Sequence, residues 1–187
     1  MSHRILDLFF SLICLIILSP FLLIICILIK IETTGPVIHW SKRIGINEQI
    51  FLMPKFRSMR INTPDVATHL MQNPSLYVTN VGSFIRKYSI DELPQLYSIF
   101  KGDISFIGPR PALFNQYDLM KLRREYGIEK FKPGLTGYAQ VMGRDFLTIE
   151  KKVEYEKFYA ENRNIILDLR ILYLTILKII KTSNIRH

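Results

Sequence analysis

The first thirty residues carry the strongest hydrophobic pattern of the chain. Residues 8–29 contain no charged side chain and are interrupted near their midpoint by Ser19-Pro20. A helix of this length would extend about 33 Å, enough to cross the roughly 30 Å core of a bilayer. Proline removes one helical hydrogen bond and clashes with the preceding turn. The pattern therefore predicts either a kinked spanning helix, in which the serine hydroxyl satisfies a freed carbonyl, or a hairpin that enters and leaves on one side.

Charges at the two ends of the apolar run favour the second alternative. Arg4 precedes the run, Lys30 follows it, and the rest of the chain is basic. Because positive residues prefer the cytoplasmic side of a membrane, both ends are expected there. We therefore expect a re-entrant membrane helix hairpin over residues 1–30, broken at Ser19-Pro20, and a cytoplasmic domain over residues 31–187. A cleaved signal peptide is not predicted, since the run is too long and no small-x-small site follows it.

Short apolar stretches replace the long run after residue 30. Residues 37–59 carry glycine and proline between these stretches, which predicts two strands around residues 45–47. Helices are predicted over residues 92–100 and 113–126, with Gly127 at the end of the second. A small sheet with surrounding helices is an α+β fold.

Two further helices are predicted in the C-terminal third, over residues 149–162 and 165–180, from apolar residues at helical spacing. Basic and aromatic side chains flank their apolar faces. Such helices either lie in a membrane interface or pack their apolar faces on the domain core, and the sequence leaves both alternatives open.

Composition narrows the range of partners. The chain has 187 residues and a formal charge of +9, so anionic partners are expected. The apolar run and the absence of a nucleic-acid-binding motif argue against nucleic acid. Both cysteines, Cys14 and Cys26, lie within the apolar run and are expected to be neither a disulfide nor metal ligands. The four histidines are scattered, and no zinc, Walker A or serine-hydrolase motif is present.

Adjacent acids, Asp91 and Glu92, are the first candidates for chemistry. They could simply begin a helix, because Ser89 and Glu92 have the spacing of a capping box. Alternatively Asp91 is the cap, which places Pro94 in the first turn, where proline is tolerated. Either arrangement explains one of the two acids, so a catalytic role is considered for the pair.

Basic residues recur around this pair in the sequence. Lys55 and Arg57 would share one face of an extended strand, and Arg86 lies five residues before Asp91. Arg110 stands between two prolines, and its planar, five-donor guanidinium suits bidentate recognition of phosphate. Any one of these residues could belong to a solvated surface, but together they indicate an anionic substrate.

Four motifs occur together in order: Lys55-Phe-Arg-Ser-Met59, Ser89-Ile-Asp-Glu-Leu-Pro-Gln-Leu96, Lys101-Gly-Asp-Ile-Ser-Phe-Ile-Gly-Pro-Arg-Pro111 and Lys132-Pro-Gly-Leu-Thr-Gly137. In these motifs the chain resembles the bacterial sugar transferases, specifically the small monotopic polyprenyl-phosphate phosphoglycosyl transferases. The resemblance extends from about residue 4 to residue 181.

The resemblance implies a reaction and a membrane topology. It implies a re-entrant helix broken at Ser19-Pro20. Asp91 would attack the sugar-linked phosphate of a UDP-sugar, release UMP and hold the phospho-sugar covalently. Polyprenyl (undecaprenyl) phosphate would then accept the phospho-sugar. Glu92 would be the ligand of a magnesium ion, Mg2+, on the diphosphate.

The resemblance also implies the substrate contacts and the location of the enzyme. The expected substrate-binding residues are Lys55, Arg57, Arg86, Arg110, Pro111, Gln140 and Arg144. The expected location is the cytoplasmic face of the bacterial inner membrane, in contact with membrane lipids, at the first membrane step of glycoconjugate synthesis. Met142 and Asp145 depart from the family pattern, so no sugar is assigned. A homo-oligomer is compatible with the sequence.

Two other classes of protein share some of these features. A non-catalytic membrane-surface adaptor would explain the anchor and the basic helices, but it gives no reason for acids and arginines in this pattern. A polytopic transferase with the same substrates would need several spanning segments, and the sequence has one apolar run of that length.

Overall fold

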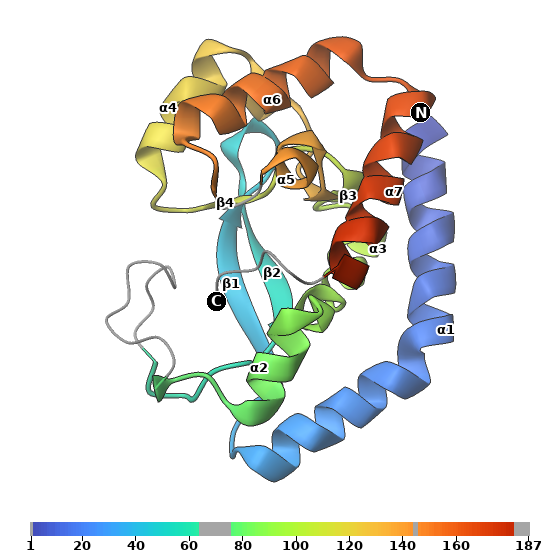
Figure 1. Cartoon of the computed structure of the whole chain (residues 1–187), viewed down its shortest axis with the longest axis vertical. Helices are drawn as coiled ribbons and strands as arrows, with labels where there is room; N and C mark the ends of the chain where they lie inside the picture. The colour runs from blue at the N-terminus through green and yellow to red at the C-terminus, as the bar shows by residue number, and fades with distance from the viewer. Residues whose placement is uncertain (1, 64–75, 144–145, 182–187) are drawn as a thin grey trace.

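The computed structural model describes residues 2–63, 76–143 and 146–181. Its longest element, helix α1 (Ser2–Glu32), lies along one edge of the molecule and bends sharply partway along its length (Figure 1). Pro20 is inside this helix, and the Ser19 hydroxyl donates to the carbonyl of Ile16 at 2.8 Å. Proline is the usual cause of such a bend. Because the chain stays helical through Ser19-Pro20, the predicted break is a bend within one helix, and the hairpin is not confirmed.

Two small sheets form the centre of the domain. Strands β1 (Ile38–Ile44) and β2 (Ile50–Phe56) pair antiparallel, which confirms the two strands predicted from the sequence. Strand β4 (Ala112–Leu113) pairs with the other edge of β1, so the order is β2-β1-β4. Strands β3 (Ser105–Ile107) and β5 (Gly134–Thr136) form a separate parallel pair. The mixture of helices with a small sheet confirms the α+β class.

Short helices connect the strands, and two long helices close the chain. In chain order they are η1 (Ile46–Glu48), α2 (Asn80–Lys87), η4 (Ile90–Glu92), α3 (Gln95–Lys101), α4 (Tyr117–Glu125), η5 (Ile128–Lys130), α5 (Tyr138–Met142), α6 (Ile149–Asn162) and α7 (Ile165–Lys181). Helices α6 and α7 confirm the two C-terminal helices predicted from periodicity.

Two helices begin later than the sequence predicted. Helix α3 begins at Gln95 and not at residue 92, because residues 90–92 form the separate 3-10 turn η4 and Pro94 takes the cap position. Helix α4 begins at Tyr117 and not at residue 113, because the two residues of β4 pair with β1. In both cases tertiary contacts replaced a turn of helix that local propensity allowed.

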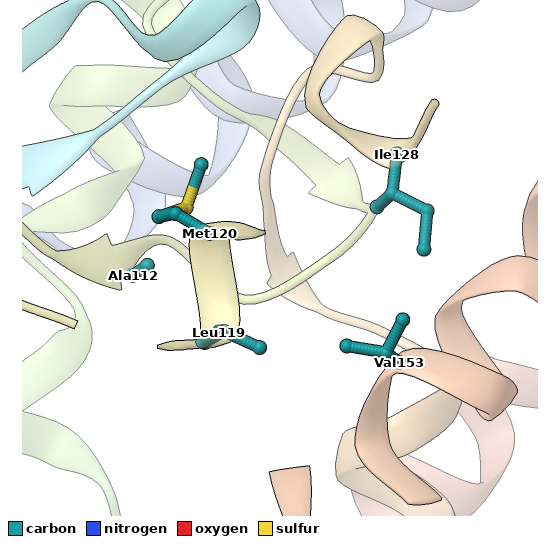
Figure 2. Packing of buried hydrophobic residues seen from close by; sticks show 5 residues of the cluster. All are labelled: Ala112, Leu119, Met120, Ile128 and Val153. Carbon is teal, nitrogen blue, oxygen red and sulfur yellow. The ribbon is translucent and has the colours of Figure 1, made fainter. Parts of the chain in front are cut away.

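Buried side chains join α4 and α6 to the sheet. Figure 2 shows this cluster, formed by Ala112 of β4, Leu119 and Met120 of α4, Ile128 of η5 and Val153 of α6. All five are at most 4% exposed. Each large apolar side chain buried in this way contributes roughly 1.5–3 kcal/mol to stability. The cluster therefore holds α4 and α6 firmly against the strand that follows residues 108–111.

Helix α7 has two apolar faces, and only one of them packs on the domain. Ile171 is fully buried against the core, whereas the opposite face is exposed. The exposed apolar residues of α7 include Ile165, Ile166, Leu169, Tyr173, Ile176 and Ile180. Packing on the core accounts for α6, which buries Val153 and Tyr159, but it leaves the outer face of α7 unexplained.

Helix α1 is likewise largely exposed. Within the described ranges, residues 3–32 are the one helical stretch long and apolar enough to cross a membrane, and 11% of its most apolar window is buried. A core helix of a soluble domain would be mostly buried. The exposed apolar surface of α1 therefore distinguishes it from such a helix.

Both ends of α1 are hydrogen-bonded to the same domain. Near the N-terminus, Arg4 donates to two carbonyls at the C-terminal end of α3, at 2.6 and 2.7 Å. The buried Asp7 carboxylate accepts from the Ser105 hydroxyl of β3 at 3.1 Å. At the other end, the Glu32 carboxylate accepts from the first two amides of α2, at 2.6 and 3.0 Å. The bend in α1 thus lets both of its ends reach one folded unit.

Candidate active site

The two acids predicted from the sequence lie in the 3-10 turn η4, between α2 and α3. Ser89 precedes this turn with a left-handed backbone (φ 56°), and its side chain makes no cap hydrogen bond. Helix α3 begins only after Pro94. Neither of the two capping arrangements considered from the sequence is formed, so helix capping does not account for Asp91 and Glu92.

Glu92 is the centre of a cluster of charges. The Lys55 ammonium, near the end of β2, donates to Glu92 Oε1 at 3.2 Å. The Arg110 guanidinium, from the segment between β3 and β4, donates to both carboxylate oxygens, at 2.5 and 3.3 Å. These side chains are between 13% and 28% exposed, so solvent weakens their attraction less than it would at an open surface. Three segments far apart in the sequence meet at one carboxylate.

The pKa of the Asp91 carboxyl lies above its ordinary value of 3.8. The pKa of Asp91 is raised to about 6, most strongly by burial and next by repulsion from Glu92. Lys55, Arg86 and Arg110 lower the pKa, but they do not cancel the effect of burial. A carboxyl whose pKa is moved toward neutrality within a charged cluster is typical of a functional group.

Four predicted cation and acid positions therefore surround Asp91: Lys55, Arg86, Glu92 and Arg110. Arg86 lies in the last turn of α2, where burial lowers the pKa of this arginine and the nearby charge of Asp91 opposes that change. The structure brings together residues that the sequence could only place in order along the chain.

Arg43, in β1, also belongs to the cluster, and the sequence analysis missed it. Its Nη1 donates to the carbonyl of Pro111 at 3.2 Å. Burial, with a smaller contribution from repulsion by Arg110, lowers the pKa of Arg43 to about 10, although the Glu92 carboxylate acts in the opposite direction. The signal that could have identified Arg43 is its place in the strand that pairs with the one carrying Lys55.

Arg57 takes a different place from the one predicted. Strand β2 ends at Phe56, so the expected common face with Lys55 is not continued. Arg57 Nη2 donates to the carbonyl and the hydroxyl of Thr33, at 3.1 and 2.7 Å, just beyond the end of α1. Among the described charges that act on the pKa of Asp91, Arg57 does not appear. In this structure Arg57 ties α1 to β2.

The remaining predicted contacts lie around the cluster or outside the described residues. Pro111 follows Arg110, and its carbonyl accepts the hydrogen bond from Arg43. Gln140 lies in α5 and donates to the carbonyl of Leu135 at 3.1 Å, while its side-chain oxygen is buried without a hydrogen-bond partner. Arg144, like the atypical Asp145, lies outside the described residues, and Met142 ends α5 with 44% of its surface exposed.

A protein-built metal site is not evident among the described residues. No group of three or more histidine, cysteine, aspartate or glutamate side chains converges there. Mg2+, however, needs only one or two carboxylates when substrate phosphates supply the other ligands. Asp91 and Glu92 fit that requirement.

A half-buried acid pair with four cations around it, beside a long exposed apolar helix, defines a site for an anionic substrate. Over residues 1–182 the sequence matches the family described as bacterial sugar transferase, and the chain belongs to this family. It is therefore an enzyme, which decides against the non-catalytic adaptor.

Similar proteins include members with stated reactions. The chain is 35% identical to the exopolysaccharide production protein ExoY of Sinorhizobium fredii, over 94% of this chain and 84% of the relative. It is 37% identical to the UDP-glucose:undecaprenyl-phosphate glucose-1-phosphate transferase of Klebsiella pneumoniae, over 94% of this chain and 39% of the relative. It is 36% identical to the UDP-N-acetylgalactosamine-undecaprenyl-phosphate N-acetylgalactosaminephosphotransferase of Aeromonas hydrophila, over 91% and 41%. The chain thus spans most of the first relative and a smaller part of the other two.

Proposed function

We propose that this enzyme transfers a sugar-1-phosphate from a UDP-sugar to polyprenyl phosphate, with Asp91 as the nucleophile. The observation that carries the proposal is the acid pair itself: Glu92 accepts hydrogen bonds from Lys55 and Arg110, and the pKa of the adjacent Asp91 is raised to about 6. The names of two relatives support the reaction class, because both describe transfer of a sugar phosphate to undecaprenyl phosphate. Those two relatives differ in their sugar, so no sugar is proposed for this chain.

The proposed reaction has two displacements at one phosphorus. An oxygen of Asp91 attacks the sugar-linked phosphorus, the bond from that phosphorus to the bridging oxygen breaks, and UMP leaves with the electron pair. An oxygen of the lipid phosphate then attacks the same phosphorus and breaks its bond to Asp91. This restores the carboxylate and yields polyprenyl-diphospho-sugar. A covalent intermediate divides one difficult transfer between a soluble and a lipid substrate into two easier steps.

The cations near Asp91 would offset the repulsion between its carboxylate and the diphosphate of the substrate. A carboxylate that approaches a diphosphate meets like charge, at a cost of about 4 kcal/mol per unit pair at 4 Å in an effective dielectric of 20. Uncompensated, this alone would slow the reaction roughly a thousandfold. Lys55, Arg86 and Arg110 lie close enough to act on the pKa of Asp91, so they are placed to offset the charge of a diphosphate there.

We propose Mg2+ as the cofactor, with Glu92 as its ligand from the protein. When bound, the ion would neutralise charge on the diphosphate and on the leaving UMP. Glu92 contributes a carboxylate at the centre of the cluster. Lys55 and Arg110, which donate to Glu92, would supply donors for phosphate oxygens at the same place.

We further propose that α1 is re-entrant: it enters the bacterial inner membrane from the cytoplasmic face and returns to that same face. Two facts support this topology: both ends of α1 are hydrogen-bonded to one domain, and its apolar surface between them is exposed. A straight helix of 31 residues would be about 47 Å long and would separate its ends across the bilayer. The bend at Ser19-Pro20 keeps the acid pair at the level of a lipid phosphate.

A release assay tests the proposed chemistry. Purified protein with Mg2+ and a panel of UDP-sugars, without lipid acceptor, should release about one UMP per chain and gain the mass of one phospho-sugar. A parallel reaction with a chelator should release none. Asp91→Asn should form no adduct, whereas the control Asp103→Asn, at the end of α3, should behave as the wild type. The proposal fails if no UDP-sugar modifies the wild type or if Asp91→Asn forms the adduct undiminished.

A further inference from the structure

Residues 108–111 carry Arg110, whose side chain contacts Glu92. The backbone carbonyl groups of this segment accept hydrogen bonds from the rest of the domain. Pro109 and Pro111 have no backbone N–H, so the segment has few donors of its own. Three successive carbonyls, from Pro109 to Pro111, nevertheless each accept a hydrogen bond. The donors are a backbone amide of β5 at 2.9 Å and two arginine side chains at 2.8 and 3.2 Å. Two of the three supports are therefore guanidinium groups and not ordinary backbone pairing.

Arg123 of α4 is the more deeply buried of these two arginines. Its Nη2 donates to the carbonyl of Arg110 at 2.8 Å. Its Nε and Nη2 also donate to the two carboxylate oxygens of Glu156 in α6, at 2.8 and 2.6 Å. Arg123 is 5% exposed and Glu156 is 3% exposed. A continuous chain of hydrogen bonds thus runs from α6 through Arg123 to the backbone of Arg110, and from the Arg110 side chain to Glu92.

Stability alone does not explain this buried pair. Desolvation of two charges largely cancels their attraction, and well-packed apolar residues of similar volume are often as stable in the same place. A guanidinium, however, can bind a carboxylate with two N–H groups and still direct a donor at a carbonyl beyond it. The cluster in Figure 2 holds the two helices that carry Arg123 and Glu156 against the strand after this segment. The pair is therefore fixed on a rigid support and aimed at one carbonyl.

We propose that Arg123, oriented by Glu156, is a positioning residue that fixes Arg110 for its contact with Glu92 and with the diphosphate of the substrate. Arg123 acts through the backbone of Arg110 and does not touch the reacting atoms. The part that concerns the diphosphate rests on the proposed function, whereas the part that concerns Arg110 and Glu92 does not.

The variants must remove the support without leaving a buried charge. Replacing Arg123 alone by an apolar residue would leave the Glu156 carboxylate buried and unpaired, which strongly destabilises a fold. The double variant Arg123→Met with Glu156→Met removes both charges together. The control is Arg124→Met with Glu48→Gln, because Arg124 is the neighbouring arginine of α4 and pairs with Glu48 at 2.7 Å. Arg123→Lys keeps the charge next to Glu156 but has one nitrogen for two partners, and it serves as a second test variant.

The first measurement does not depend on activity. Nitrogen-15 relaxation of the Arg110 Nε–H group, in the full chain in detergent micelles, reports how firmly this side chain is held. We expect an ordered Arg110 in the wild type and in the Arg124 control. We expect a clearly mobile Arg110 in the double variant and an intermediate one in Arg123→Lys. An Arg110 that stays equally ordered in all four proteins overturns the proposal.

The second measurement is the rate of UMP release in a single turnover. We expect the rate of UMP release to fall between about tenfold and a hundredfold in the double variant. A displacement of a catalytic group by about 1 Å can cause a loss of this size. In an Arg110→Ala background the same double substitution should cause little further loss, because its effect passes through Arg110. Losses that multiply independently in the two backgrounds overturn the proposal. A wild type that releases no UMP refutes the proposed function instead, and the relaxation measurement then decides the role of Arg123.

Discussion

Asp91 shows how burial and charge compete at a single carboxyl group. Burial and Glu92 raise its pKa, three cations lower it, and the result is a pKa of about 6. Roughly nine-tenths of such a group is ionised at pH 7, the form that the proposed role as nucleophile requires. Because the folded protein favours the neutral form, the ionised carboxylate is less stabilised than one in a strong ion pair. An acid in this state is suited to form a bond.

The first prediction at the residue scale concerns the pH dependence of UMP release. Only the ionised Asp91 can attack, so the single-turnover rate should rise with pH, reach half its maximum near pH 6 and level off above about pH 7. Rapid-quench measurements between pH 5 and pH 8 would check this. A rate that is constant over this range would mean that Asp91 titrates near the ordinary pKa of 3.8.

The second residue-scale prediction concerns stability. In the folded state the pKa of Asp91 is raised, so the folded protein binds a proton more tightly than the unfolded chain does. The folded state therefore loses stability as pH rises from about 4 to about 6, and the loss persists above that range. Asp91→Asn removes this loss and should be more stable than the wild type at pH 8, by at most about 3 kcal/mol.

Denaturation of the detergent-solubilised protein at two pH values would check that prediction. The difference between Asp91→Asn and the wild type should be largest at pH 8 and should nearly vanish at pH 4. Asp103→Asn, whose carboxyl pairs with Lys101 at 3.1 Å near the surface, should change stability little at either pH. A destabilised Asp91→Asn at pH 8 would show that the cations outweigh burial.

At the scale of elements, α1 combines the apolar middle of a membrane helix with ends that are hydrogen-bonded to a folded domain. Its middle is as apolar as a spanning helix, while both ends make polar contacts of the kind found between elements of one soluble domain. The Ser19 hydroxyl bonds to the carbonyl of Ile16, so part of the hydrogen bonding disturbed by Pro20 is recovered within the helix. A bent helix therefore forms where sequence reasoning expected a break.

The prediction for this element is that Pro20 determines the bend. Pro20→Ala restores a helical hydrogen bond, and the straighter helix should pull one end of α1 away from the domain. We expect UMP release to fall at least tenfold and reagents applied from the cytoplasmic side to label one chain end less in sealed vesicles. Ile17→Ala, at a position that is 70% exposed, is the control and should change neither. Unchanged labelling with full activity in Pro20→Ala would show that the proline does not turn the chain.

At the scale of the whole molecule, the helices α1 and α7, which both carry exposed apolar surface, lie near each other. Figure 1 shows the N-terminal half of α1 near α7. His3 Nδ1 of α1 lies 3.8 Å from Asp168 Oδ2 of α7. A basic protein with such a surface is suited to a membrane interface. The outer face of α7 would then hold the acid pair close to the lipid phosphate that we propose as acceptor.

The prediction at this scale separates the two half-reactions. Ile166→Glu with Tyr173→Glu places charge on the outer face of α7, which should lift that side of the enzyme from the bilayer. Transfer to polyprenyl phosphate in vesicles should fall by at least about tenfold, while UMP release without lipid stays unchanged. Asn115→Glu adds an acid at an exposed position elsewhere and should affect neither step. Equal loss in both steps would show that α7 supports the domain and does not seat it.

Much of the molecule could be predicted because its signals are local. Apolar spacing identified α6 and α7, glycine and proline placed the β1–β2 pair, and adjacent acids among scattered cations indicated an anionic substrate. The start of α3 was wrong because a separate 3-10 turn and Pro94 displaced it. Pro94 is a local signal, but the turn before it also places Glu92 against Lys55 and Arg110, and local propensity does not include such contacts.

The sequence by itself determined which residues are available: one apolar helix with a proline, an acid pair, and basic residues in a fixed order. Only the tertiary structure decided which of them meet. Lys55 and Glu92 are 37 positions apart, and Arg43 reaches a carbonyl 68 positions away. Arg57, two residues beyond Lys55, turns instead to the end of α1. Periodicity and capping act over a few residues, whereas a charge cluster requires packing of distant elements, so the site became visible only in the fold.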